Sequence, residues 1–145
     1  SFTGTDRRFE YKGKFGGVTV VDDYAHHPTE IAATLDAARQ MGYDRVICVY
    51  QPHTYSRTKG LFDEFAAALG KADLPILCDI YAARETDTLG VASELLAKAT
   101  RGAVYMESFD RIADYLREHA RAGDLILTMG AGDIAKLAGL LLGGK

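Results

Sequence analysis

The sequence has no apolar run long enough to cross a bilayer, and it has no excess of positive charge. Its formal net charge is −3, and hydrophobic residues make up 48% of the chain. The first absence argues against a membrane-spanning protein. The second argues against nucleic-acid binding, which depends on clustered lysine and arginine. We therefore expect neither a membrane nor a nucleic acid as a partner.

Cysteine is also scarce. The two cysteines, Cys48 and Cys78, each lie in an apolar, strand-like run and have no CxxC spacing. We therefore expect buried thiols in a reducing compartment, the cytoplasm, rather than a disulfide or a metal site. The N-terminus lacks the apolar core of a signal peptide, and the missing initiator Met suggests a processed protein or, as we favour, a piece excised from a longer one.

Two common catalytic motifs are missing. There is no GxSxG elbow and neither cysteine lies in a loop beside a histidine, so covalent nucleophilic catalysis has no support. The segment Gly130-Ala-Gly132 is not a Walker A loop, and it follows the last expected strand, whereas a GxGxxG fingerprint follows the first. The chain therefore lacks its own cradle for a triphosphate.

What the chain does contain is an alternation of strand-like and helix-like segments, over a length of 145 residues that suits a single domain. Strands are expected at 8–11, 18–21, 46–50, 74–80, 103–106 and 125–129. Helices are expected from 28, at 61–69, 93–99 and 109–120, and from 134. This pattern predicts a Rossmann-like α/β three-layer sandwich, with a mostly parallel sheet of about six strands and one antiparallel edge strand.

The most informative segment is Asp-Asp-Tyr-Ala-His-His-Pro-Thr-Glu, residues 22–30, which lies between an expected strand and an amphipathic helix. Pro28 suits the first turn of that helix, and Ile31, Leu35 and Ala38 recur at helical spacing. In an open parallel sheet, the strand ends that face helix N-termini form the usual ligand crevice.

Three polar loops are expected to meet at that crevice: 22–30, Gln-Pro-His-Thr-Tyr-Ser-Arg-Thr at 51–58, and 130–133. Each loop alone also has a structural interpretation, because aspartates cap turns and glycines permit tight ones. Their convergence favours a binding site for the first two loops, whereas the structural interpretation stays ahead for 130–133. Metal ligation by His26 and His27 is not expected, because adjacent histidines on a turn diverge and no third ligand has a recognisable spacing.

The chain resembles the C-terminal domain of the UDP-N-acetylmuramate:L-alanine ligases of the Mur ligase family. The resemblance rests on motifs in the same order: Arg-Arg-Phe, the 22–30 and 51–58 segments, Leu-Phe-Asp-Glu-Phe, Asp-Ile-Tyr-Ala-Ala-Arg-Glu and Gly-Ala-Gly-Asp-Ile. It covers essentially all of residues 1–145. It implies that this is the third domain of a ligase whose N-terminal UDP-sugar domain and central ATPase domain are absent from the chain.

The resemblance implies an ATP-dependent, amide-forming ligase that adds L-alanine to UDP-N-acetylmuramate in cytoplasmic peptidoglycan precursor synthesis. ATP would phosphorylate the muramoyl carboxylate, and the amine of L-alanine would attack the acyl phosphate. The implied cofactors are ATP and Mg²⁺. Most Mg²⁺ ligands would lie in the central domain, so the isolated third domain is expected to be inactive.

The same resemblance implies roles for individual residues. Arg8 and Asp23 would contact ATP. Four residues would line the L-alanine pocket: Tyr24, His26, His53 and Arg57. His26 and Arg57 are the expected catalytic residues, with Arg57 as the clamp for the amino-acid carboxylate. Some members carry Arg where this chain has Thr54, so a hydroxyl would replace that contact, and His27 is expected to be structural.

Other functions remain open from the sequence. A sister ligase that recycles a whole muropeptide shares the Asp-Asp-(Tyr/Phe)-Ala-His-His-Pro motif, but the 51–58 motif is not expected in it. The chain could also be a stand-alone Rossmann-like module that binds a nucleotide or an amino acid. A receiver-type signalling domain ranks last, because it would need Asp79 as phosphoacceptor and leaves the histidine-rich loop without a role.

Overall fold

A computed structural model of the chain describes residues 9–143. Within this range six strands form one sheet. In spatial order they are β1 (Glu10–Phe15), β2 (Val18–Asp23), β6 (Asp124–Met129), β3 (Arg45–Tyr50), β4 (Leu74–Leu77) and β5 (Val104–Tyr105). The β1–β2 pair is antiparallel and the other pairs are parallel, as the sequence predicts.

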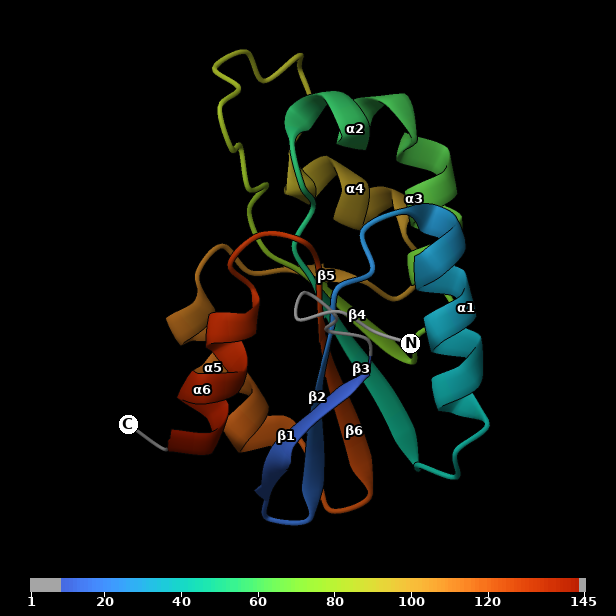
Figure 1. The fold of residues 1–145 in the computed structure, drawn as a ribbon, viewed down its shortest axis with the longest axis vertical. Helices are drawn as coiled ribbons and strands as arrows, with labels where there is room; N and C mark the ends of the chain where they lie inside the picture. The colour runs from blue at the N-terminus through green and yellow to red at the C-terminus, as the bar shows by residue number, and fades with distance from the viewer. Residues whose placement is uncertain (1–8, 144–145) are drawn as a thin grey trace.

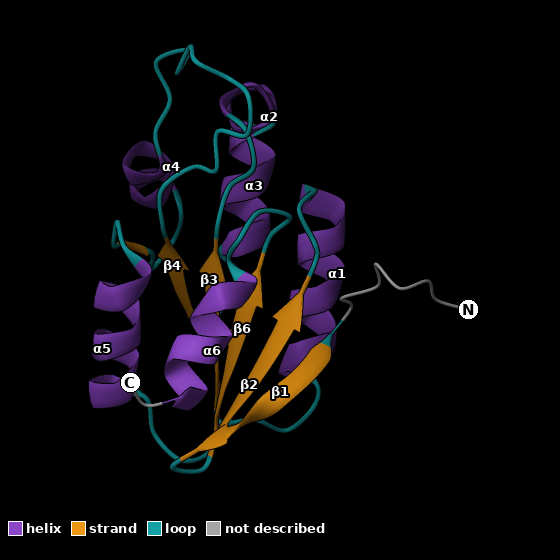
Figure 2. Ribbon diagram, turned by 60° about the vertical axis from the view of Figure 1, so that its left-hand side comes forward, coloured by secondary structure: helices purple, strands orange, loops and turns teal. Residues whose placement is uncertain are grey.

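Helices cover both faces of the sheet (Figures 1 and 2). One face packs against α1 (Pro28–Arg39), α3 (Phe62–Leu69) and α4 (Ser93–Ala99), and the other packs against α5 (Phe109–His119) and α6 (Ala135–Gly143). A short helix, α2 (Tyr55–Gly60), lies beyond the strand ends. This arrangement confirms the predicted three-layer sandwich.

Alternation along the central strand shows why two helical layers are needed. On β3, Val46, Cys48 and Tyr50 belong to the core under α1, α3 and α4, whereas Ile47 and Val49 belong to the core under α5 and α6. All five side chains are buried. A strand with apolar residues on both faces has to be covered on both, which is the usual setting of a parallel sheet.

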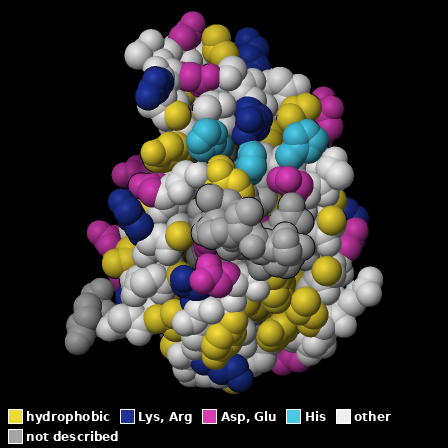
Figure 3. All heavy atoms as spheres, viewed as in Figure 1, with side chains coloured by type: hydrophobic (Ala, Val, Ile, Leu, Met, Phe, Trp, Pro, Cys, Tyr) yellow, Lys and Arg dark blue, Asp and Glu magenta, His cyan; other side chains and the backbone are white. Residues whose placement is uncertain are grey.

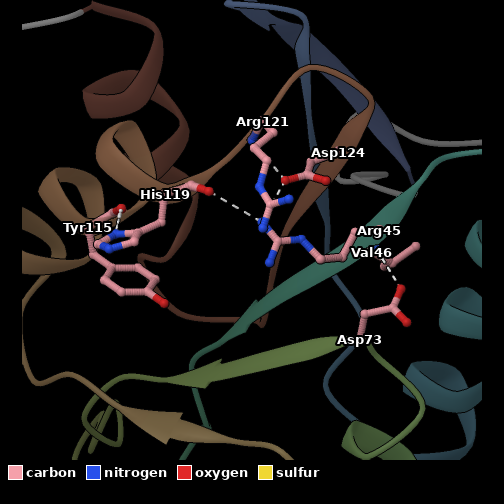
Figure 4. A network of polar contacts seen from close by, with 7 residues as sticks. All are labelled: Arg45, Val46, Asp73, Tyr115, His119, Arg121 and Asp124. Carbon is pink, nitrogen blue, oxygen red and sulfur yellow. Dashed lines mark hydrogen bonds and ion pairs between the residues drawn. The ribbon is translucent and has the colours of Figure 1, made fainter.

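A polar network joins the amino ends of β3 and β6, at the opposite end of the strands from α2 (Figure 4). Asp124 Oδ2 accepts hydrogen bonds from Arg45 Nη2 at 2.8 Å and from the backbone N–H of Arg121 at 2.9 Å. Burial alone would raise the pKa of Asp124, but these donors lower it below its ordinary value. Asp73 adds a second tie, because its Oδ2 accepts from the backbone N–H of Val46 at 2.7 Å.

The structure corrects the ends of two expected strands and adds one helix. Arg8, expected to start the first strand, lies outside the described residues, and β1 continues to Phe15 because a bulge between Tyr11 and Gly13 lets the strand pass a glycine. The strand expected at 74–80 ends at Leu77, where its pairing with the two-residue β5 ends. Helix α2 was not predicted, because its sequence Tyr-Ser-Arg-Thr-Lys-Gly has no apolar periodicity. No helix among residues 9–143 is long and apolar enough to cross a membrane.

Candidate functional site

The predicted site loops meet at one edge of the sheet. The carboxyl ends of β2, β3, β4 and β6 point the same way, toward α2 and the loops around it (Figure 2). Residues 22–27, 51–57 and 130–133 therefore lie near one another although they are far apart in the sequence, as the parallel topology requires. A fourth segment, residues 78–92 between β4 and α4, joins them.

The two aspartates that end β2 are both buried and hold the site loop in place. Asp22 Oδ1 accepts from Thr128 Oγ1 on β6 at 2.6 Å. Asp23 accepts the backbone N–H of Phe9 on Oδ2 and that of Ala25 on Oδ1, each at 2.8 Å. These two hydrogen bonds fix the carboxylate of Asp23 at the start of the loop.

The adjacent histidines diverge, as expected. His27 is the N-cap of α1, and its Nδ1 accepts from the backbone N–H of Thr29 at 3.2 Å. Pro28 follows in the first helical turn. The ring of His26 turns the other way, with Nδ1 at 3.0 Å from the carbonyl oxygen of Tyr24 and 3.9 Å from Glu30 Oε1. His27 therefore has the structural role predicted for it, and His26 faces the other site loops.

A row of aromatic rings links those loops. The ring of Tyr24 meets His26 edge-on at 5.1 Å, His26 lies 6.5 Å from His53, and His53 stacks on Tyr81 at 5.5 Å with an interplanar angle of 22°. Histidine side chains gather visibly on this face, with basic side chains beside them (Figure 3). The structure thus brings together three predicted residues, Tyr24, His26 and His53, and adds Tyr81, which sequence reasoning had not assigned.

Arg57 supplies positive charge to this row from α2. Its guanidinium makes no hydrogen bond or ion pair with any of residues 9–143, although its backbone N–H donates to Thr54 Oγ1 at 3.3 Å. The pKa of His53 is lowered, first by burial and then by the positive charges of Arg57 and His26, while Glu85 opposes these effects. His53 is therefore neutral at neutral pH, and its buried Nδ1 has no hydrogen-bond partner among the described residues.

A cavity of about 550 Å³ opens beside the β2–α1 turn. Its wall is mostly apolar, with Asp23 and Glu30 as its carboxylates. The lining residues are Phe9, Asp23, Tyr24, Ala25, Thr29, Glu30, Ala33, Thr34, Ala37 and Met41. An apolar hollow with few polar groups is the usual form of a small-molecule site. Asp23 lines it, whereas Arg8, the other expected ATP contact, lies outside the described residues.

The Gly130–Asp133 loop packs against two of the site segments, at Gln51 and Tyr81. Asp133 Oδ1 accepts from Gln51 Nε2 at 2.7 Å. A Cβ on Gly130, whose φ is 145°, would lie 2.8 Å from the carbonyl oxygen of Gln51, and one on Gly132 would lie 2.7 Å from Tyr81 Cγ. The two glycines therefore permit close packing of the 51–54 and 78–92 segments.

Among residues 9–143, no three His, Cys, Asp or Glu side chains gather closely enough to hold a metal ion. Residues 9–143 therefore offer no ready-made protein cage for Mg²⁺, an ion that is usually held by one or two carboxylates together with substrate phosphates.

Parallel strands under two helical layers, with polar loops at the carboxyl edge, define the class of Rossmann-like ligand-binding domains. Residues 7–132 match the family described as "Mur ligase, glutamate ligase domain". The chain belongs to this family.

Curated relatives are UDP-N-acetylmuramate–L-alanine ligases. That of Lachnospira eligens is 56% identical over 146 residues, covering 98% of this chain and 32% of the relative. That of Clostridium botulinum strain Langeland is 55% identical over 141 residues, covering 94% and 31%. The chain thus spans about a third of the length of these relatives.

Solved structures share the fold. A murein peptide ligase from Psychrobacter arcticus has a TM-score of 0.76 and 27% identity, over 94% of this chain and 29% of that one. A domain of a Haemophilus ducreyi protein assigned as a UDP-N-acetylmuramate:L-alanyl-gamma-D-glutamyl-medo-diaminopimelate ligase has a TM-score of 0.70 and 31% identity. In that case the match covers 94% of this chain and 98% of the other.

Proposed function

We propose that this chain is the C-terminal domain of a cytoplasmic, ATP-dependent ligase that joins L-alanine to UDP-N-acetylmuramate through an acyl phosphate. Relatives at 51–56% identity carry that activity in their names, which supports the choice of substrate. The UDP-sugar domain, the ATPase domain and the Mg²⁺ ligands would lie in the remaining two thirds of the full-length ligase. The isolated domain would be inactive, because it has no phosphate cradle.

The observation that carries the proposal is the guanidinium of Arg57 beside a neutral His53. A zwitterionic amino acid needs a cationic clamp for its carboxylate, and a guanidinium provides two parallel donors for it. Arg57 is half-buried and has no partner among residues 9–143, so it is available for this contact. A neutral imidazole also keeps one ring nitrogen as an acceptor for the ammonium group of the same substrate.

The proposed division of labour follows from these positions. Arg57 clamps the carboxylate of L-alanine, His53 and Tyr24 line the pocket, and His26 faces the muramoyl carboxyl group. His26 and Arg57 would then act as the catalytic residues by holding the amine close to the acyl carbon. Closure of this domain over the other two would exclude water from the labile acyl phosphate.

ATP is proposed to meet the domain at the cavity beside α1. The apolar wall suits adenosine, and Asp23 lines the cavity with oxygens able to accept from ribose hydroxyls. Arg8 would act near the phosphates. The cavity volume of about 550 Å³ lies within the range of small-molecule sites.

The second candidate is a ligase that recycles a muropeptide, favoured by the similarity to the Psychrobacter arcticus murein peptide ligase. That likeness is 27% identical, about half of the identity to the L-alanine ligases. Assaying the full-length protein with free L-alanine and with L-alanyl-D-glutamyl-diaminopimelate separates the two. ATP hydrolysis that depends on L-alanine and not on the peptide is expected, and the reverse would refute the proposal. A stand-alone binding module would show neither.

We expect Arg57→Ala in the full-length ligase to raise KM for L-alanine far more than KM for ATP. Loss of a charge-assisted contact of this kind costs about 2–5 kcal/mol. Steady-state kinetics with each substrate varied in turn measures the split. The matched variant is Asp23→Ala, which should raise KM for ATP more than KM for L-alanine. Equal effects of Arg57→Ala on both substrates would count against the clamp.

A further inference from the structure

Thr54, which joins β3 to α2, has an unfavourable backbone conformation. Its φ is 65° and its ψ is 148°, a combination that is almost restricted to glycine. Thr54 is β-branched, so its side chain crowds the backbone there. Such a conformation persists only when surrounding contacts enforce it. Because Thr54 lies between His53 and Arg57, the same contacts fix the relative positions of these two side chains.

The enforcing contacts come from the segment after β4. The backbone N–H of Thr54 donates to the carbonyl oxygen of Tyr81 at 2.8 Å, and that of Tyr81 donates to the carbonyl oxygen of Pro52 at 2.8 Å. The ring of Tyr81 also stacks on that of His53. The backbone of Tyr81 is therefore hydrogen-bonded to the residue on each side of His53.

Glu85 holds the other side of the strained residue. Its Oε1 accepts the backbone N–H groups of Tyr55, at 2.5 Å, and of Ser56, at 3.1 Å, and its Oε2 accepts the hydroxyl of Ser56. The Ser56 hydroxyl first, and then the two N–H groups, lower the pKa of Glu85, so the carboxylate is ionised at neutral pH. One carboxylate thus satisfies donors in the first turn of α2, the helix that carries Arg57.

We propose that Glu85 is a positioning residue: through Tyr55 and Ser56 it enforces the strained turn at Thr54 and so fixes Arg57 against His53. Glu85 touches no substrate in this scheme. Its effect on catalysis rests on the function proposed above, whereas its effect on the turn does not. The segment 78–92 then braces the turn between β3 and α2, to which it is attached at Tyr81 and Glu85.

The first test is structural and uses this chain, since the Haemophilus ducreyi domain of nearly the same extent was crystallised as a separate chain. In Glu85→Ala, the amides of Tyr55 and Ser56 should lose their hydrogen-bonded NMR shifts and exchange faster with deuterium. Asp87→Asn is the matched control, because Asp87 belongs to the same segment, and among residues 9–143 its side chain bonds only to the backbone N–H of Leu89, at 2.9 Å. Unchanged Tyr55 and Ser56 amides in Glu85→Ala would overturn the proposal.

The second test uses the full-length ligase. Glu85→Ala should raise KM for L-alanine about 10- to 100-fold, the effect of small misplacement of a binding group, while KM for ATP stays near the parent value. In Glu85→Gln, KM for L-alanine should lie between those of the parent and Glu85→Ala, because the amide oxygen still accepts from backbone N–H groups. If Glu85→Gln and Glu85→Ala raise KM for L-alanine equally while the amide signals of Tyr55 and Ser56 stay unchanged, Glu85 contacts the ligand directly and the positioning role is refuted. If the parent itself shows no L-alanine-dependent activity, the proposed function fails, and the amide measurements still decide the role of Glu85.

Discussion

The imidazole of His53 is surrounded by charged groups from three segments. Arg57 on α2 and His26 before α1 disfavour its protonation, and Glu85 on the 78–92 segment favours it. Burial is the largest effect and also lowers the pKa. The protonation of this one residue therefore reports how the three segments are placed around it.

We expect Arg57→Gln to raise the pKa of His53, because a positive neighbour is removed while burial and the glutamate remain. The carbon-bound ring protons of His53, followed by NMR against pH in this chain, measure the change. His119 is an internal control, since its Nδ1 lies 2.9 Å from the carbonyl oxygen of Tyr115 on the other helical layer. A shift of both histidines, or of neither, would contradict the local interaction.

The lowered pKa of His53 also makes the free energy of unfolding depend on pH. The folded-state pKa of His53 lies below its ordinary value of about 6.5. As the pH falls below that ordinary value, the unfolded chain therefore binds a proton before the folded one does. His53 thus lowers the stability of the domain progressively from about pH 6.5 down to its own folded pKa.

Residue identities in the site were partly predictable. Tyr24, His26 and His53 were expected together, because residue type and position at strand ends follow from the alternation of apolar and polar segments. Tyr81 and Glu85 were not assigned roles, because the 78–92 segment has no periodicity and its contacts depend on where the chain returns. The positive φ of Thr54 was equally unpredictable, since it runs against the preference of the residue.

At the scale of elements, the carboxyl ends of the strands bear the site and the amino ends bear the network around Asp124 (Figure 4). The pairs Arg45–Asp124 and Asp73–Val46 join β3 to its neighbours there. This end of the sheet is therefore where a substitution should affect stability without affecting ligand binding.

Asp124→Asn should lower the free energy of unfolding by about 1.5–3 kcal/mol at pH 7, the usual contribution of a hydrogen bond to a charged group. The pKa of Asp124 is depressed in the folded state, so its contribution is present above the unfolded-state value of about 3.9 and is lost as pH falls through the folded value. Urea titrations at pH 7 and pH 3 should show the difference from the parent shrinking in acid. A difference that is the same at both pH values would contradict this.

Element types followed from the sequence more closely than their limits and order did. Helix α1 could be placed because Pro28 and the spacing of Ile31 and Leu35 mark its start and its buried face. The position of β6 between β2 and β3 could not, because the alternation of strands and helices is the same for several strand orders. Helix α2 could not either, because it is held by Glu85 rather than by an apolar face.

At the scale of the molecule, each of the two hydrophobic cores, one on either face of the sheet, contains one cysteine. Cys48 lies on central β3 in the core under α1, and Cys78 follows β4 in the core under α5 and lines a second cavity of about 290 Å³. Both are buried and free, and burial raises the pKa of each thiol to about 12. A difference in their reactivity therefore measures access and not acidity.

We expect Cys78 to react faster than Cys48 with a thiol reagent, because the cavity and the short β5 let the β4 edge open locally, whereas Cys48 needs global unfolding. Labelling rates in Cys48→Ala and Cys78→Ala, measured by mass spectrometry over a range of urea below the unfolding midpoint, give the two values. Cys48 should show the steeper dependence on urea. Equal rates with equal slopes would mean that the sheet opens only as a whole.

The strand that completes the sheet is the last one along the chain, yet it lies in the middle. Without β6, β2 has no parallel neighbour and β3 loses one side, so the other five strands are split into the β1–β2 hairpin and a separate parallel sheet of β3, β4 and β5. On the ribosome, neither part can join the other until residues 124–129 have left the exit tunnel. A premature stop codon shortly before residue 124 would leave the β1–β2 hairpin and the β3–β5 sheet with exposed strand edges. We expect such a product to be degraded by proteases rather than to persist as a smaller domain.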